Sequence, residues 1–142
     1  MKESNHIILY ADDDPDDREF FIFAARQSGV DIVTFASGQE LLSYLQGDIQ
    51  PIEKLIFIDI NMPIMSGFEC VKSIRSIKGN QNNPIMIYST SNDQSDIEQA
   101  EAYGANAYIV KPSNLNVLKS VILKIININW EHEKKFMVFS KR

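Results

Sequence analysis

The hydrophobic residues of this chain gather in five short runs, and mixed polar and apolar stretches separate them. The runs are rich in β-branched residues, and each has about the length of one strand. We predict strands over residues 6–11, 31–36, 54–59, 84–90 and 107–111. The third and fourth runs are apolar throughout and do not alternate with polar residues. This pattern indicates strands buried on both faces, as in a parallel sheet that helices cover on either side.

The stretches between these runs carry apolar residues at helical spacing, together with residues that begin and end helices. Pro15 and the acids after it favour a helix start, and Gly29 ends the apolar stripe that follows them. Ser37 and Glu40 have the spacing of a capping box. We predict helices over residues 15–28, 37–47, 66–79, 92–104 and 113–129. The fourth has a thin apolar face and should be weakly anchored. Alternating strands and helices predict an α/β fold with a doubly wound parallel sheet.

Length and composition narrow the class of protein. The 142 residues fit one domain, and the formal net charge of −5 argues against a surface for nucleic acid or acidic lipid. No run approaches the ~20 apolar residues of a membrane span, and the N-terminus lacks the apolar length of a signal peptide. Cys70 is the single cysteine, and we expect it to be a buried core residue. These features predict a cytoplasmic protein whose partners are proteins or small molecules.

The stretch YADDDPDDRE, residues 10–19, crowds five aspartates directly after the first predicted strand. Ligands of an open α/β sheet bind outside the carboxyl ends of its strands, so the residues at those ends are candidates for a site. They are Asp12, Asp13, Asp59, Ser89, Thr90 and Lys111. Carboxylates that converge in this way repel one another unless a divalent cation joins them, and Mg²⁺ suits a few carboxylates with water. We assign the neighbouring Asp14 to helix capping.

A magnesium ion beside an aspartate, a hydroxyl and a lysine suits the acceptance of a phosphoryl group, whose oxygens must be neutralised. We predict that Asp59 is the nucleophile and that Asp12 and Asp13 hold the metal. Lys111 would pair with one phosphoryl oxygen. The hydroxyl of Ser89 would donate a hydrogen bond to another and would move its loop in doing so.

Four segments, taken in order, resemble the response-regulator receiver domain of two-component signalling: YADDDPDD, FIDINMPIMSG, IYSTS and YIVKP. Their order and separations are similar to those of that family, and the resemblance covers residues 5–128. It implies a CheY-like, flavodoxin-like three-layer sandwich with a five-stranded parallel sheet in the order 2-1-3-4-5. Residues 129–142 would then form a C-terminal tail, which we predict to be a helical extension.

The resemblance also implies roles for single residues. The backbone carbonyl of Asn61 would be a further metal ligand. Tyr108 would be the switch aromatic that turns inward when the switch hydroxyl moves, with Thr90 beside that hydroxyl. The peptide bond between Lys111 and Pro112 would be cis. The signalling face would be the fifth strand with the fourth and fifth helices.

The function implied by the resemblance is that of a stand-alone receiver in a phosphorelay. It would take a phosphoryl group from a sensor histidine kinase or a histidine phosphotransfer protein onto Asp59, with Mg²⁺ as cofactor. It would then bind a downstream protein target through a changed face, as a monomer or a phosphorylation-dependent dimer. It would catalyse its own phosphorylation and dephosphorylation and would otherwise not be an enzyme.

Other functions fit the residues less well. A phosphatase of the haloacid-dehalogenase type needs an acid two positions after the nucleophile, where this chain has Asn61. A flavodoxin-type carrier needs Gly, Ser or Thr after the first strand, where DDDPDD repels phosphate. An EF-hand needs Gly and an acid at its sixth and twelfth loop positions, where this chain has Asp17 and Phe23. A degenerate receiver that only binds partners would not need the complete set of site residues.

Overall fold

The strands of the computed structural model, which describes residues 6–47 and 52–140, all run parallel in a single sheet. They are β1 (His6–Ala11), β2 (Asp31–Phe35), β3 (Glu53–Ile58), β4 (Ile85–Ser89), β5 (Ala107–Val110) and β6 (Met137–Phe139). The order across the sheet is β2-β1-β3-β4-β5-β6. The first five strands confirm the predicted positions and the order 2-1-3-4-5.

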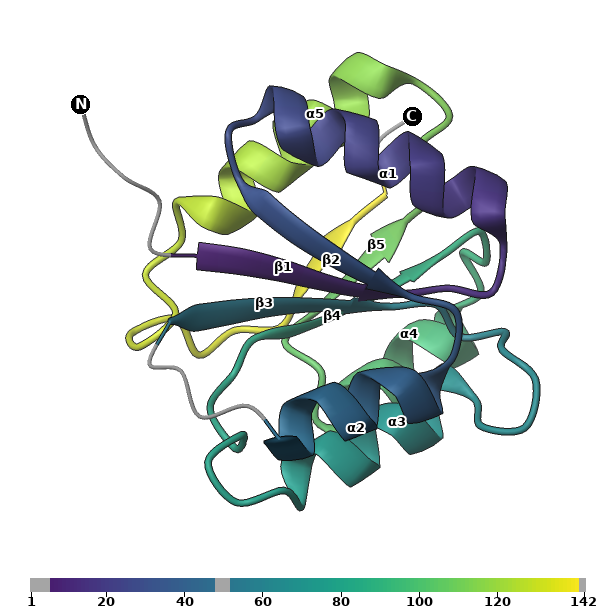
Figure 1. Ribbon diagram of the computed structural model, residues 1–142, viewed down its shortest axis with the longest axis vertical. Helices are drawn as coiled ribbons and strands as arrows, with labels where there is room; N and C mark the ends of the chain where they lie inside the picture. The colour runs from purple at the N-terminus through teal and green to yellow at the C-terminus, as the bar shows by residue number, and fades with distance from the viewer. Residues whose placement is uncertain (1–5, 48–51, 141–142) are drawn as a thin grey trace.

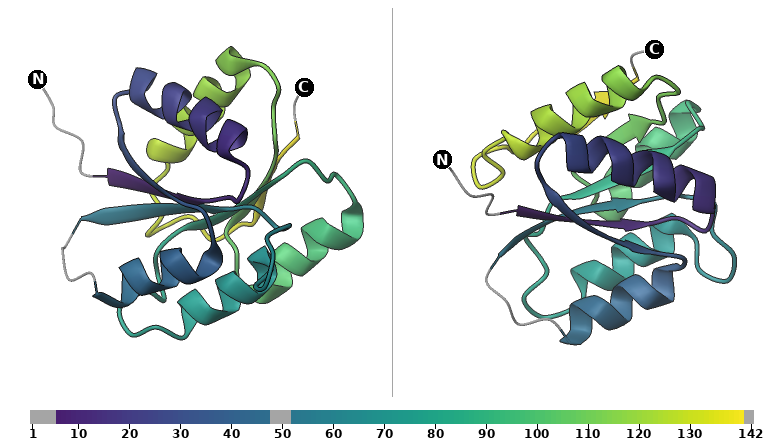
Figure 2. Two further views of the ribbon diagram at one scale, coloured as in Figure 1. Left: turned by 45° about the vertical axis from the view of Figure 1, so that its right-hand side comes forward. Right: turned by 45° about the horizontal axis from the view of Figure 1, so that its top comes forward.

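Helices cover both faces of the sheet. They are α1 (Pro15–Gln27), α2 (Gly38–Gly47), α3 (Gly67–Arg75), α4 (Gln94–Tyr103) and α5 (Leu115–Ile126). Helices α1 and α5 lie on one face, and α2, α3 and α4 lie on the other (Figure 1). The same three layers are visible from two further sides in Figure 2. The flavodoxin-like α/β fold is therefore confirmed. Between residues 6 and 47 and between 52 and 140, no helix combines the length and apolar character needed to cross a membrane.

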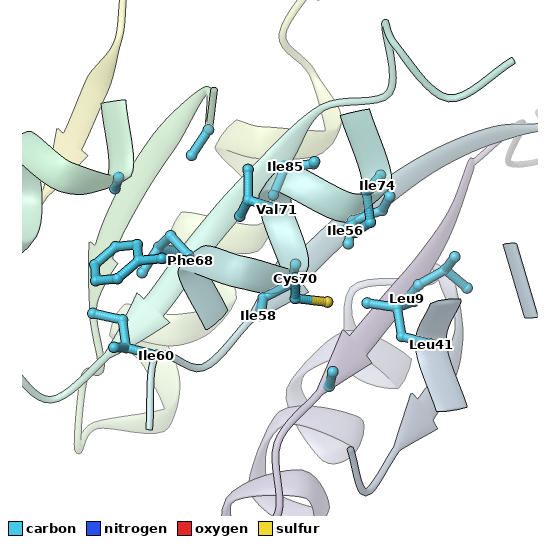
Figure 3. Close-up of a cluster of buried hydrophobic side chains, with 14 of the residues drawn as sticks. Leu9, Leu41, Ile56, Ile58, Ile60, Phe68, Cys70, Val71, Ile74 and Ile85 are labelled. Carbon is cyan, nitrogen blue, oxygen red and sulfur yellow. The ribbon is translucent and has the colours of Figure 1, made fainter. Parts of the chain in front are cut away.

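The central strands supply both halves of the core because their side chains alternate between the two faces. Ile56 and Ile58 of β3 belong to the cluster under α2, α3 and α4, part of which Figure 3 shows. Leu55 and Phe57 of the same strand belong to the cluster under α1 and α5. Cys70 lies in the first cluster, is fully buried, and has its thiol pKa raised by burial to about 12. This confirms that Cys70 is a core residue.

Helix α3 ends at Arg75, earlier than the predicted end at Gly79. The Arg75 guanidinium explains the difference, because its Nη1 donates to the carbonyl of Asn83 at 2.7 Å and to that of Gln81 at 3.1 Å. The chain after the helix is thereby folded back around this side chain. Gly79 lies in the resulting turn with φ of 90°, a conformation that favours glycine.

Helices α4 and α5 differ in how firmly they are held. In α4, all of which is described, Ala100 is the one buried residue. In α5 the buried residues are Leu118, Val121, Ile122 and Ile125. The prediction of a thinly anchored fourth helix and a firm fifth helix is confirmed.

The prediction of a helical extension for the C-terminal tail is wrong. Helix α5 ends with Asn127 as its C-cap, and Trp130 turns back so that its Nε1 donates to the carbonyl of Ile125 at 3.1 Å. The chain then returns to the sheet and forms β6 beside β5. Phe136 and Phe139 pack partly against the two core clusters there. Burial of these apolar side chains at the sheet edge favours a strand over an exposed helical turn.

Candidate functional site

Three of the predicted site residues directly follow strands, and their backbones continue the hydrogen bonding of the sheet. The amide of Asp12 donates to the carbonyl of Phe35 at 3.0 Å, and the amide of Asp59 donates to that of Ala11 at 3.1 Å. The amide of Lys111 donates to the carbonyl of Ser89 at 2.8 Å. Since the strands are parallel, these side chains emerge at one edge of the sheet, as predicted.

The acidic residues form a compact cluster at this edge. One carboxylate oxygen each from Asp12, Asp13 and Asp59 lies within 4.8 Å of the others. Asp12 is fully buried, Asp59 is 7% exposed, and Asp13 is exposed to solvent. Clustered carboxylate oxygens that are partly open to water form a donor set suited to a hard divalent cation that retains water. The residues present therefore fit the predicted magnesium site.

Lys111 is the cation of the site, and its side chain is 10% exposed. Its Nζ lies 2.8 Å from Asp12 Oδ2, 2.7 Å from Asp17 Oδ2 and 3.7 Å from Asp59 Oδ2. Burial acts to lower the pKa of the ammonium, but its hydrogen bonds to Asp12 and Asp17 outweigh that effect and raise the pKa. The lysine is thus held in its charged form between the carboxylates.

At Asp59 the effect of burial on the pKa prevails over that of the nearby lysine, in contrast to Lys111. Burial raises the pKa of its carboxyl group to about 7, with Lys111 acting against the shift and Asp12 adding to it. Its Oδ1 accepts a long hydrogen bond, 3.5 Å, from the amide of Asn61. The charged carboxylate is therefore poorly satisfied by protein groups alone, and a cation at this point would stabilise it.

Asp12 is fixed by groups close to it in the chain. The hydroxyl of Tyr10 donates to Asp12 Oδ2 at 2.5 Å, and the amide of Asp14 donates to Asp12 Oδ1 at 2.9 Å. Arg18 Nη1 donates to the backbone carbonyl of Asp12 at 2.6 Å. Burial, followed by the charge of Asp12, raises the pKa of the Tyr10 hydroxyl, so that it remains a donor. Asp12 is consequently oriented before any ligand arrives.

The crowded aspartates divide into different tasks. The Asp14 carboxylate caps α1 by accepting from the amides of Asp16 at 2.9 Å and Asp17 at 3.4 Å, which confirms its predicted role. Sequence reasoning missed the pairing of Asp17 with Lys111. The signal was the place of Asp17 in the first turn of α1, immediately after the loop that carries the other acids, although the distant Lys111 gives no local sign of the pair.

The predicted switch residues are joined through one loop residue. Ser89 is fully buried, and its Oγ accepts from the amide of Ser91 at 3.2 Å. The Tyr108 side chain is buried, and its hydroxyl donates to the carbonyl of Ser91 at 2.8 Å. Thr90 lies between Ser89 and Ser91 in the chain and is exposed to solvent. Ser91, which sequence reasoning missed, thus connects the hydroxyl to the aromatic.

The expected cis bond before Pro112 is not found. All peptide bonds within the described residues are trans, including the one between Lys111 and Pro112. The prediction of a cis bond is therefore wrong for this structure. Lys111 still reaches the three carboxylates, because the end of β5 already directs its side chain toward them.

The loop after Asp59 is packed tightly against the end of β3. The amide of Gly67 donates to the carbonyl of Ile60 at 2.9 Å. A Cβ atom at Gly67 would lie 2.5 Å from the backbone oxygen of Asp59, so a side chain is excluded at that position. Glycine therefore allows α3 to begin directly against the segment that presents the candidate nucleophile.

Comparison with known proteins agrees with this geometry. The family model described as the response regulator receiver domain matches residues 8–123. The chain therefore belongs to the response regulator receiver family, which is not a family of conventional enzymes. Both the acidic edge of the sheet and its strand order are accounted for by that assignment.

Among curated proteins, the chain is 30% identical over 105 residues to an uncharacterized 14.6 kDa protein of Leptolyngbya boryana, covering 74% of this chain and 78% of that one. It is 32% identical over 121 residues to the CAI-1 autoinducer sensor kinase/phosphatase CqsS of Vibrio cholerae. That match covers 83% of this chain but 17% of the kinase, so this chain corresponds to a small part of the larger protein.

Among solved structures, the chemotaxis response regulator CheY4 of Vibrio cholerae has a TM-score of 0.75 and 28% identity, and the match covers 84% of this chain and 98% of that one. The receiver domain of the sensor histidine kinase PA1611 of Pseudomonas aeruginosa was solved with a magnesium ion in its active site cleft. It has a TM-score of 0.73 and 22% identity over 86% of this chain and 98% of that one, which shows likeness of fold.

Proposed function

We propose that this receiver accepts a phosphoryl group on Asp59 in a reaction that depends on Mg²⁺. The donor would be a histidine kinase or a histidine phosphotransfer protein, as the family implies. The observation that carries the proposal is the meeting of the Asp12, Asp13 and Asp59 carboxylates within 4.8 Å, with the Lys111 ammonium 3.7 Å from Asp59. A cluster of acids with one cation at the edge of a parallel sheet suits phosphoryl transfer more than it suits a structural role.

The site residues either hold the metal or take part in the transfer of the phosphoryl group. Asp12, Asp13, Asp59 and the backbone carbonyl of Asn61 would hold Mg²⁺, which when bound neutralises phosphoryl oxygens. A carboxylate oxygen of Asp59 attacks phosphorus while the bond to the histidine nitrogen of the donor breaks, and the electron pair of that bond stays with the nitrogen. The product is an acyl phosphate on Asp59 and an unphosphorylated donor.

Lys111 and Ser89 would respond to the new charge. Lys111 shares its ammonium between Asp12 and Asp17, and a phosphoryl group on Asp59 would compete with Asp17 for it. Ser89 Oγ would turn its hydrogen toward a phosphoryl oxygen and weaken its bond to the amide of Ser91. The metal and these two residues together would neutralise the transferred group.

The signal would pass through the loop between β4 and α4. Ser91 contacts both Ser89 and Tyr108, so movement of the serine hydroxyl changes what holds the Tyr108 ring in place. The loop leads into α4, whose thin anchoring allows it to shift at low energetic cost. The downstream protein target would bind the face formed by α4, β5 and α5, of which β5 now has β6 at its outer edge.

The receiver would act as a stand-alone protein in the cytoplasm, with a domain boundary near residue 128. It would act as a monomer or as a dimer that forms on phosphorylation.

The experiment is labelling with a small phosphodonor, acetyl phosphate, followed by intact-protein mass spectrometry. The wild-type chain should gain one phosphoryl group with Mg²⁺ present and none with a chelator. Asp59→Asn should abolish the gain, whereas the matched control Asp14→Asn, which makes the same change of charge at a capping residue, should keep it. Undiminished labelling of Asp59→Asn would end the assignment.

A further inference from the structure

The C-terminal tail creates a surface that the five-stranded prediction did not contain. A groove of about 750 Å³ runs between α5 and β6, with Leu123 of α5 and Met137 and Phe139 of β6 among its lining residues. A second hollow of about 700 Å³ shares Phe139 with the groove and reaches Val138. Figure 1 shows the yellow C-terminal strand at the edge of the sheet next to β5. The two hollows form one continuous surface, which we call the α5–β6 groove.

This groove combines apolar and basic side chains. Leu123 and Val138 are both 45% exposed, which is unusual for large apolar residues in this chain. Lys119 and Lys124 of α5 lie beside them in the lining. Among the described residues that line either hollow there is no aspartate or glutamate, although the whole chain has a net charge of −5. The groove is therefore a basic and apolar patch on an acidic protein.

The groove also borders an open strand edge. β6 is the last strand in the sheet order and pairs with β5 on its inner side. Within residues 6–47 and 52–140, no further strand pairs with its outer side. The outer backbone N–H and C=O groups of such a strand can pair with an added chain. β6 itself joins β5 in this way, with Tyr108 in register with Val138.

We propose that the α5–β6 groove binds a short extended segment of a partner protein in which apolar and acidic side chains alternate. The segment adds as a further strand to the outer edge of β6. Its carboxylates lie on the face toward α5 and pair with Lys119 and Lys124. Its apolar side chains lie on the opposite face and pack against Val138, because Met137 and Phe139 take the α5 face of β6. The inference goes beyond phosphoryl transfer and does not require a phosphoryl group, so docking occurs in the unmodified chain.

Charge decides between this occupant and a second copy of the chain. A symmetric dimer through the β6 edge would place the same patch opposite itself. Lys119 and Lys124 of one copy would then approach the same lysines of the other, and like charges brought together disfavour association. An acidic segment meets the lysines with opposite charge. The groove therefore fits an acidic partner better than it fits itself.

The test uses the full ¹⁵N-labelled chain without phosphodonor and a capped synthetic peptide of alternating valine and glutamate. We expect the peptide to shift the backbone amide signals of β6 and of the neighbouring part of α5. A peptide of alternating valine and lysine should not bind. A valine–glutamate peptide methylated on alternate backbone nitrogens should bind about tenfold more weakly, because it lacks the donors for strand pairing.

Paired variants test the role of charge. Lys119→Glu with Lys124→Glu should weaken binding about tenfold at low salt, in keeping with two partly exposed ion pairs. The matched control, Lys72→Glu with Lys78→Glu, makes the same change in net charge away from the groove and should bind as the wild type does. If the first pair does not fold, Lys124→Glu alone, at an exposed position, carries the same comparison.

Several results would overturn the proposal. They are equal weakening by both pairs of variants, equal binding of the glutamate and lysine peptides, or signal shifts confined to α4. Dimerisation of the chain in sedimentation, together with concentration-dependent shifts of the β6 amide signals, would show that a second copy occupies the groove. Labelling of Asp59 is measured on the same preparations. Failure of peptide binding with intact labelling refutes the groove alone, and failure of labelling with intact binding refutes the proposed function alone.

Discussion

The two ends of the parallel sheet each hold a cation, and the two are satisfied in different ways. At the carboxyl ends, Lys111 lies among the carboxylates of Asp12, Asp17 and Asp59. At the amino ends, Arg75 donates to neutral oxygens, including the carbonyl of Gly104 at 2.9 Å and the side-chain amide oxygen of Asn106 at 2.7 Å. The hydrogen-bond acceptors of the arginine are neutral, whereas those of the lysine are carboxylates, which outnumber it.

This difference separates a cation that joins two loops from a cation that lies among an excess of carboxylates. Arg75 joins the loop before β4 to the loop before β5 through the carbonyls of Asn83 and Gly104. Lys111 does not neutralise the carboxylates around it, and the pKa of Asp59 stays raised. The carboxyl ends of the strands, where negative charge is in excess, therefore form the edge that a divalent cation would stabilise.

The largest effect on stability is expected at Lys111. Lys111→Met leaves the fully buried Asp12 carboxylate without its cation, so the free energy of unfolding should fall by about 4 kcal/mol in a chelator. Added Mg²⁺ should restore part of the loss. Urea denaturation with and without Mg²⁺ measures both values. Lys78→Met, at an exposed lysine, is the control, and an equally small loss in both variants would contradict the account.

A smaller loss of stability, independent of Mg²⁺, is expected at the amino ends of the strands. Arg75→Met removes hydrogen bonds to several backbone carbonyls and should lower the free energy of unfolding by about 3 kcal/mol. Because Arg75 is at the amino ends of the strands, Mg²⁺ affinity and labelling of Asp59 in the folded protein should not change. A variant that kept its stability but lost Mg²⁺ binding would mean that the two ends are not independent.

Substitution of Asp59 by asparagine should increase the stability of the metal-free protein. Since burial raises its pKa to about 7, ionisation of Asp59 costs folding free energy, and this cost develops as the pH rises from the ordinary aspartate pKa through 7. Asp59→Asn should therefore stabilise the metal-free protein by about 2 kcal/mol at pH 8, and the gain should vanish well below pH 4.

Thermal unfolding across that pH range, in a chelator, measures this effect. Asp14→Asn is the matched control, because asparagine caps helices as well as aspartate does, and it should give no such pH-dependent gain. A loss of stability in Asp59→Asn at pH 8 would show that the carboxylate is already well satisfied without a metal.

The smallest effect on stability is expected at Asp13. This residue is exposed, so Asp13→Asn should change the free energy of unfolding by less than about 0.5 kcal/mol. It should nevertheless weaken Mg²⁺ binding about tenfold, because it removes one of three clustered carboxylates. Calorimetric titration measures the affinity. Unchanged affinity in Asp13→Asn, or a loss of equal size in Asp14→Asn, would exclude Asp13 as a ligand.

Much of the fold and site followed from the sequence because it depends on local signals. The five apolar runs became β1 to β5, and the polar residues directly after them, such as Asp12, Asp59 and Lys111, met at one edge. Parallel strands bring their carboxyl ends together whatever the details of packing. The residue types and their places in the chain were therefore sufficient to predict the cluster that forms the candidate site.

The features that sequence reasoning missed depend on contacts between distant segments. The pairing of Asp17 with Lys111 joins α1 to the end of β5, and no local pattern indicates it. The early end of α3 depends on the positions of the carbonyl groups that accept hydrogen bonds from the Arg75 guanidinium. The tail forms β6 because a sheet edge is there to bury Phe139, whereas its sequence alone is compatible with a helix.

The most direct test is a crystal structure grown with Mn²⁺, a divalent ion whose anomalous scattering locates it. We predict one Mn²⁺ in contact with the carboxylates of Asp12, Asp13 and Asp59, and none near Arg75. The account would be contradicted by a Mn²⁺-free acidic cluster in which Asp59 turns away from Asp12 and Lys111 extends into solvent.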